Sequence, residues 1–135
     1  MIELETSVLQ AVLLVDSVEQ GERGKKTLKG VFTSIHLSSL PAVASFYLFL
    51  RWQGSSDGEH HHILRILNPE GILLSEFKGS FAFPRANAME ELVIYYENLP
   101  VRVAGEYRIE ALFDGKNAGS LVIPVLIDSQ NEEDR

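Results

Sequence analysis

The chain contains no cysteine among its 135 residues. Without cysteine there is no disulfide framework, no cysteine-ligated zinc and no thiol catalysis. A cysteine-free chain also fits a reducing compartment, so we expect a cytoplasmic protein. Basic residues are scarce as well, since 12 Lys and Arg against 19 Asp and Glu leave a net charge of -7. Nucleic-acid binders need a basic surface for phosphate contacts, so we predict no nucleic-acid partner.

Long apolar runs are also missing. The run from Val8 to Val15 is interrupted by Gln10, and Glu3 and Glu5 stand where a signal peptide would carry Lys or Arg. Nothing approaches the length of a transmembrane segment, so we predict no membrane association. No apolar pattern with a period of 3.6 residues extends far enough for a long helix. The patterns that are present are those of strands.

The clearest strand lies near the C-terminus, where apolar and charged residues alternate from residue 106 to 114. Its apolar members are Tyr107, Ile109, Ala111 and Phe113. Asp114-Gly115 then supplies a tight hairpin turn, and a second alternating stretch covers residues 121–127. In immunoglobulin-like sandwiches a Gly-x-Tyr sequence opens the penultimate strand, as Gly105 and Tyr107 do here. We therefore expect residues 107, 109 and 113 to be buried, and the Tyr107 hydroxyl to bind backbone upstream of Gly105.

About eight strand candidates follow one another along the chain. They cover residues 8–16, 27–37, 43–53, 59–67, 72–78, 92–98, 106–113 and 121–127. Gly30 breaks the alternation of the second strand, which predicts a bulge there. Residues 79–89 fit either a strand extension through Phe81 and Phe83 or a single helical turn. The pattern predicts an all-β, immunoglobulin-like antiparallel β-sandwich of about 7–9 strands in one domain, residues 1–128, followed by an acidic flexible tail, residues 129–135.

Three short motifs carry a resemblance to a known family. They are Leu28-Lys29-Gly30-Val31-Phe32, the turn Asn68-Pro69-Glu70-Gly71, and Gly105-Glu106-Tyr107 with a later Asp-Gly. With these motifs the chain resembles a bacterial family of small uncharacterised single-domain proteins, a domain of unknown function. The resemblance implies an immunoglobulin-like sandwich and brings no activity with it. We predict no cofactor.

Two histidines form the one cluster that resembles a metal site. His60 and His62 lie two residues apart on a predicted strand, so both imidazoles point to the same side and could bind one ion. A third ligand would have to come from Asp57 or Glu59. The alternative is a strand start at which amphipathic histidines are simply tolerated. A metal-dependent enzyme using His60 and His62 is therefore the second alternative for function.

Four basic residues gather before the second strand: Arg23, Lys25, Lys26 and Lys29. They could attract an acidic partner. However, Glu19 and Glu22 lie among them, so a solvated loop is the favoured interpretation.

The aromatic residues suggest a binding face. If the even-numbered apolar residues of strand 43–53 face the core, Tyr47 and Phe49 emerge on the outer face of their sheet, and Tyr95 does likewise. We predict that Tyr47 and Phe49 contact either a second protomer or the Phe81–Met89 segment. The leading function is a non-enzymatic protein-interaction module with an unknown protein partner, a homodimer being one form. The first alternative is a small-molecule or carbohydrate-binding sandwich that uses Tyr47, Phe49 and Tyr95.

Overall fold

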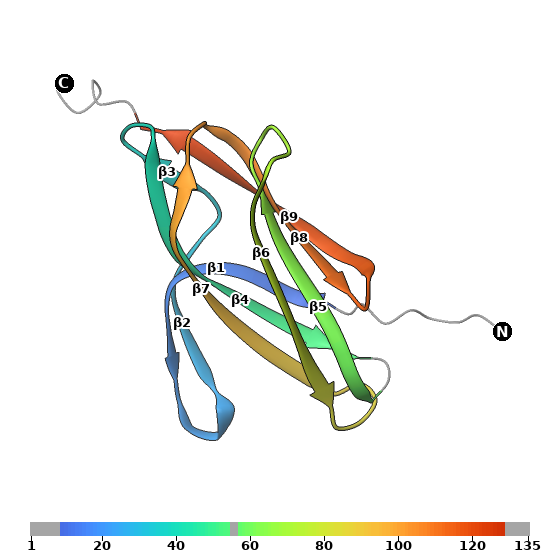
Figure 1. Cartoon of the computed structure of the whole chain (residues 1–135). Coiled ribbons are helices and arrows are strands. Elements are labelled where there is room, and N and C mark those ends of the chain that lie inside the picture. Colours follow the sequence, from blue (N-terminus) through green and yellow to red (C-terminus); the bar gives the residue numbers. More distant parts are fainter. Residues whose placement is uncertain (1–8, 55–56, 129–135) are drawn as a thin grey trace.

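The computed structural model describes residues 9–54 and 57–128, and these residues form an all-β sandwich (Figure 1). The described strands are β1 (Leu9–Gln20), β2 (Lys26–Phe32), β3 (Ile35–Leu37), β4 (Ala42–Gln53), β5 (Gly58–Leu67), β6 (Leu73–Phe83), β7 (Met89–Val101), β8 (Gly105–Phe113) and β9 (Lys116–Ile127), with a 3-10 turn at Glu22–Gly24. One sheet has the order β2-β1-β4-β7 and the other β3-β9-β8-β5-β6. The predicted class and number of strands are confirmed. Val8 and the predicted acidic tail lie outside the described residues.

The core forms where the apolar faces of the two sheets meet. On β4, four alternating side chains are at most 3% exposed: Phe46, Leu48, Leu50 and Trp52. They face Leu64 and Ile66 of β5 and the buried residues of β8 and β9 within one continuous cluster. This burial confirms the predicted alternation. It also fixes which face of β4 points outward.

The C-terminal hairpin has the predicted tyrosine corner. Tyr107 and Ile109 are both 2% exposed, and Phe113 is half-buried against the core. The Tyr107 hydroxyl donates a hydrogen bond of 2.6 Å to the carbonyl of Val103, upstream of Gly105. That bond ties the start of β8 to the loop before it, as in immunoglobulin-like domains.

The predicted second strand is in fact two strands in different sheets. β2 ends at Phe32, and β3 begins at Ile35 and pairs in parallel with β9. The sandwich is therefore not purely antiparallel as predicted. The bulge predicted at Gly30 is also wrong, because the β1–β2 register runs past Gly30 without a shift. Instead, Gly30 has a φ of +70°, and the Asp16 side chain occupies the space that a Cβ would need.

The ambiguous segment, residues 79–89, is strand as far as Phe83 and a turn over residues 84–88. β6 continues to Phe83 along β5, and Phe83 is 2% exposed in the core. β7 begins at Met89 and runs beyond the predicted end at Asn98. Its register against β4 shifts there, and Asn98, with a φ of 57°, donates a backbone hydrogen bond of 2.9 Å to the Ser45 hydroxyl. This bulge lets the strand pass through Pro100, which an edge strand tolerates.

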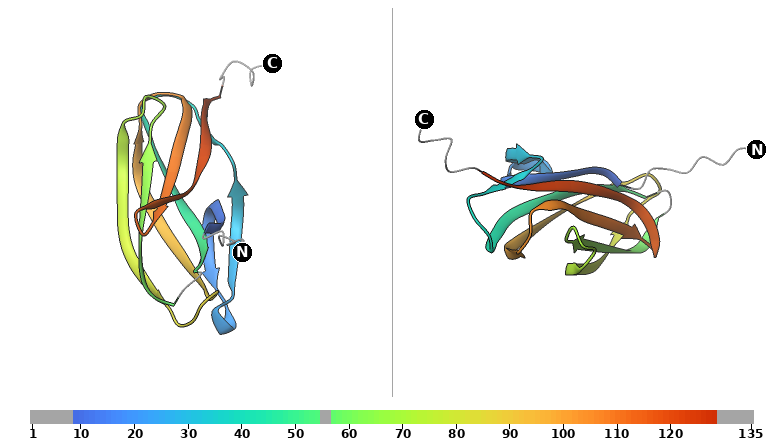
Figure 2. Two further views of the ribbon diagram at one scale, coloured as in Figure 1. Left: turned by 90° about the vertical axis from the view of Figure 1, so that its right-hand side faces the viewer. Right: turned by 90° about the horizontal axis from the view of Figure 1, so that it is seen from above.

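The β1–β2 hairpin extends beyond the rest of its sheet, which the sequence does not predict. β1 pairs with β4 only as far as Val15 and then continues with β2 alone. The hairpin extends past β4 and turns toward the outer face of the β2-β1-β4-β7 sheet, and Figure 2 shows it on the opposite side of the molecule from β5 and β6. Among the described residues, no helix is long and apolar enough to cross a membrane.

Candidate interaction face

The outer face of the β2-β1-β4-β7 sheet carries two of the three predicted aromatic residues at its surface. The pairing register places four side chains in one row: Val31, Val15, Tyr47 and Tyr95. The Tyr47 and Tyr95 rings pack with their centroids 4.7 Å apart. Tyr95 is 50% exposed, Val31 53%, and Val43, on the same face of β4, 54%. We call Val31, Val43, Tyr47 and Tyr95 the exposed patch.

Phe49 lies on the same outer face but is not at the surface. It pairs with Leu13 and Val93 in the next row, and it is only 5% exposed. The β1–β2 hairpin covers it, since Phe49, Leu13 and Leu28 line one groove. The Phe81–Met89 segment does not cover this face, because Phe81 and Phe83 pack into the core with Trp52 and His60. Coverage by that segment, predicted as one of two outcomes, is therefore wrong.

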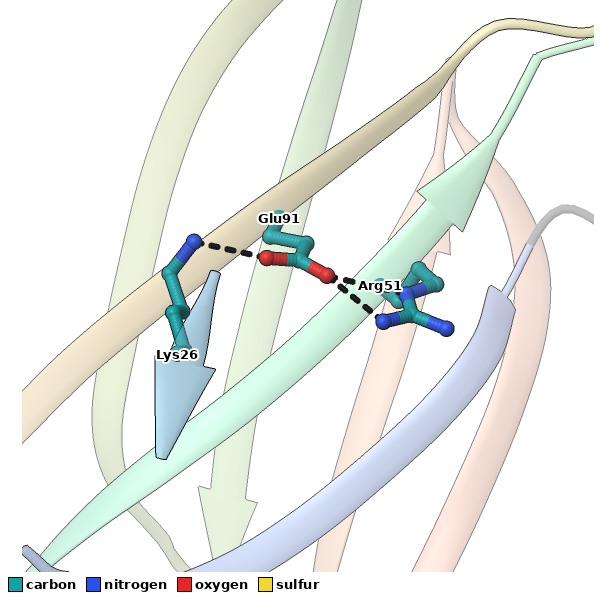
Figure 3. Close-up of polar contacts among 3 residues, drawn as sticks. All are labelled: Lys26, Arg51 and Glu91. Atoms are coloured by element: carbon teal, nitrogen blue, oxygen red, sulfur yellow. Dashed lines mark hydrogen bonds and ion pairs between the residues drawn. The ribbon is translucent and has the colours of Figure 1, made fainter. Parts of the chain in front are cut away.

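An ion-pair network fastens the hairpin to the sheet (Figure 3). Lys26 Nζ lies 2.6 Å from Glu91 Oε1, and Arg51 donates from Nε and Nη2 to Glu91 Oε2 at 3.0 and 2.7 Å. Burial alone would raise the pKa of Glu91. The hydrogen bonds from Lys26 and Arg51 outweigh it and hold that pKa below its ordinary value. Glu91 is thus a fixed anion between two cations from β2 and β4.

His60 and His62 do point to the same side of β5, but that side is the core. They are 8% and 2% exposed. The His62 ring packs among Trp52, Phe77 and Phe81, with centroids 5.0 to 5.8 Å away. Gly79 opposite leaves the room for this imidazole, because a Cβ there would lie 2.8 Å from its ring. Burial, and to a lesser extent the neighbouring His61, lowers the pKa of His62.

The carboxylate that meets the histidines is neither of the two expected. Asp57 and Glu59 are exposed, whereas Asp114 Oδ2 lies 2.6 Å from His60 Nδ1 and Asp114 Oδ1 accepts from the His61 backbone at 2.9 Å. Asp114 belongs to the Asp-Gly turn that follows β8. Because β5 pairs with β8, this turn lies beside the start of β5. In residues 9–54 and 57–128, no three His, Cys, Asp or Glu side chains come close enough to hold a metal. The cluster serves to join the β8–β9 turn to β5.

These features define an all-β, two-sheet sandwich domain with a tyrosine corner. Within that class, the chain belongs to the family of unknown function DUF6941, whose model matches residues 10–126. A comparison with curated proteins found no match.

The chain is similar to two solved structures at low sequence identity. An alkylpurine DNA glycosylase from Pseudomonas fluorescens, bound to DNA with an abasic-site analogue, is 13% identical with a TM-score of 0.53 over 85% of this chain. The chain spans 30% of that enzyme's length. A CARDB domain from Pyrococcus furiosus, solved with di-metal ions, is 10% identical with a TM-score of 0.44, covering 93% of this chain and 100% of that one. At 13% identity the likeness to the glycosylase concerns the fold alone.

Proposed function

We propose that this protein is a non-enzymatic interaction module that binds a protein partner through the exposed patch. The observation that carries the proposal is Tyr95, which is half-exposed on an edge strand and packs on Tyr47. Tyrosines of this kind are enriched at protein interfaces, because they offer a large apolar surface with little side-chain entropy to lose. Val31, in the same row, and Val43, on the same face of β4, are also exposed.

A small-molecule or carbohydrate partner at this patch is the alternative. Such sites are concave, and they surround an aromatic platform with a few placed polar groups. Here the row that holds the tyrosine pair continues into two aliphatic side chains, Val15 and Val31. A row of aromatic and aliphatic side chains favours a protein partner.

A metal-dependent enzyme using His60 and His62 has less support. His62 is enclosed by aromatic rings, and His60 is paired with the Asp114 carboxylate. A substrate or metal that reached His62 would have to displace these rings.

We also propose that the protein acts in the bacterial cytoplasm and binds no nucleic acid. The cysteine-free composition supports the first point. The net charge of -7 supports the second, and the likeness to the DNA glycosylase concerns only the fold.

Photo-crosslinking in the native host tests the proposal. A photoreactive amino acid is placed at Val43 or Tyr95 in the exposed patch, and at Lys78 or Arg108 in the other sheet as controls. The proposal predicts a discrete crosslinked species from the first two positions and none from the controls. Mass spectrometry of that species separates a second copy from a different protein. Equal crosslinking from all four positions, or none from the patch, would contradict the proposal.

A further inference from the structure

We propose that the groove beneath the β1–β2 hairpin binds a small organic anion that has an apolar body. This site is separate from the exposed patch and does not depend on the proposed function. The groove has a volume of about 540 Å³, which is in the range of small-molecule sites. Its lining residues are Ala11, Leu13, Gly24, Lys25, Lys26, Leu28, Phe49, Arg51 and Glu91.

The floor of the groove is apolar. Phe49 lies there at 5% exposure, and Leu13 and Leu28 beside it are half-buried. These side chains come from three strands that the pairing of β1 with β4 and β2 holds in fixed register. The floor can therefore accept an aromatic or aliphatic group without rearranging the sheet.

The rim of the groove is basic. Three cations, Lys25, Lys26 and Arg51, line the groove together with one carboxylate, Glu91, which leaves a surplus of two positive charges. This surplus stands out in a chain whose net charge is -7. Of the four basic residues before the second strand, Lys29 pairs instead with Glu19 at 2.7 Å, and both are more than half exposed. The positive charge at the groove is thus local.

Two of the three cations, Lys26 and Arg51, are held in place before any ligand arrives. Lys26 is only 16% exposed and is fixed by Glu91. Arg51 uses Nε and Nη2 on a single oxygen of Glu91, and its remaining nitrogen points away from that carboxylate (Figure 3). Lys25 has no ion pair with any residue in the described part of the chain. Arg51 and Lys25 can therefore donate to a carboxylate or phosphate group.

Together, floor and rim select the class of ligand. A neutral apolar molecule would leave the cations unused, and an inorganic anion would leave the floor without a contact. An organic carboxylate or phosphate monoester satisfies both. The geometry points to a headgroup at Lys25 and Arg51 and an apolar body over Phe49.

The test is a titration of the full chain, monitored by the backbone amide shifts of the groove residues. The probes are phenyl phosphate and phenylacetate, which distinguish the two headgroups. Inorganic phosphate and 2-phenylethylammonium are the controls. We expect saturable shifts confined to the groove with at least one probe at concentrations up to about 10 mM, and none with the ammonium. Lys25→Glu should weaken binding about fivefold or more, while the matched Lys29→Glu on the same hairpin should leave it unchanged.

Four results would overturn the proposal: no saturable shift in the groove, inorganic phosphate binding as tightly as phenyl phosphate, equal binding of the ammonium, or equal weakening by both lysine variants. Melting curves confirm that each variant is folded. A Tyr95→Ser variant should bind the probes as wild type does. This control distinguishes binding in the groove from binding at the exposed patch.

Discussion

The tyrosines of this sandwich differ most in the surroundings of their hydroxyl groups. The Tyr107 hydroxyl donates to a backbone carbonyl, and Tyr95 is half in solvent. The Tyr96 hydroxyl is buried without a hydrogen-bond partner among the described residues, and burial raises its pKa to about 12. A buried hydroxyl that lacks a hydrogen-bond partner destabilises the fold, whereas a hydrogen-bonded one stabilises it. The three side chains should therefore respond differently to the same substitution.

Removal of the tyrosine-corner hydroxyl should destabilise the fold. We expect Tyr107→Phe to lower the free energy of unfolding by about 1 kcal/mol, because the Val103 carbonyl loses its donor. The matched Tyr96→Phe should be neutral or stabilising, since it removes a hydroxyl that has no partner. Urea unfolding at neutral pH measures both. A larger loss in Tyr96→Phe than in Tyr107→Phe would contradict this account of the two hydroxyls.

His62 should make stability depend on pH. Burial lowers its pKa below the ordinary value of 6.5, so the unfolded chain binds a proton at a pH where the folded chain does not. The contribution of neutral His62 to the free energy of unfolding is therefore complete above pH 6.5, and it is lost as the pH falls below that value. The pKa of Asp114 lies below its ordinary value of 3.8. The contribution of Asp114 to stability is therefore lost only in more acidic solutions.

The measurement is the free energy of unfolding between about pH 7.5 and about pH 5. Wild type should lose stability over this range, and His62→Gln should lose distinctly less. His36→Gln, which changes an exposed histidine paired with Asp128, should keep the wild-type slope. A His62→Gln slope equal to that of wild type would show that His62 is not buried in its neutral form.

At the scale of strands, alternation predicted most of the structure. β4 and β5 lie within a residue of their expected limits, because their apolar faces meet one continuous core. The path of β1 and β2 could not be predicted in this way. A period of two identifies a strand but not the point where it leaves its sheet, and the contact that fastens the hairpin joins residues 65 apart. β3 was missed as a separate strand because three residues carry too little pattern.

The Lys26–Glu91 contact should hold the hairpin against the sheet. We expect Lys26→Met to speed amide hydrogen exchange in residues 17–29 by up to about fivefold, the effect of losing one partly buried ion pair. Lys29→Met is the matched control, because its pair with Glu19 is exposed at the surface. Equal exchange rates in the two variants would mean that Lys26 does not fasten the hairpin. High salt should reduce the difference in exchange rate between the two variants, because salt screens the ion pairs.

At the scale of the whole molecule, the outer face of the β2-β1-β4-β7 sheet has a covered half and an exposed half. The hairpin covers the half that contains Phe49 and leaves the half that contains Tyr95 exposed. The sequence placed Tyr47, Phe49 and Tyr95 on one face correctly, because side-chain direction follows from alternation. It could not show that Phe49 is covered, because that depends on the fold of a distant hairpin. The His60–Asp114 pair was missed for the same reason, since it depends on which strand lies beside β5.

The measurement that tests the central claim most directly is the crosslinking yield from position 43 in a Tyr95→Ser background. Tyr95 is half-exposed and packs on Tyr47 alone among the aromatic rings of the described residues, so the substitution should lower the melting temperature by only about 2–6 °C and leave the protein folded. If the exposed patch is the interaction surface, the yield of the crosslinked species should fall at least about fivefold, as expected for loss of an aromatic anchor. A yield equal to that of wild type, from a variant that is fully folded, would show that the partner does not dock on this face.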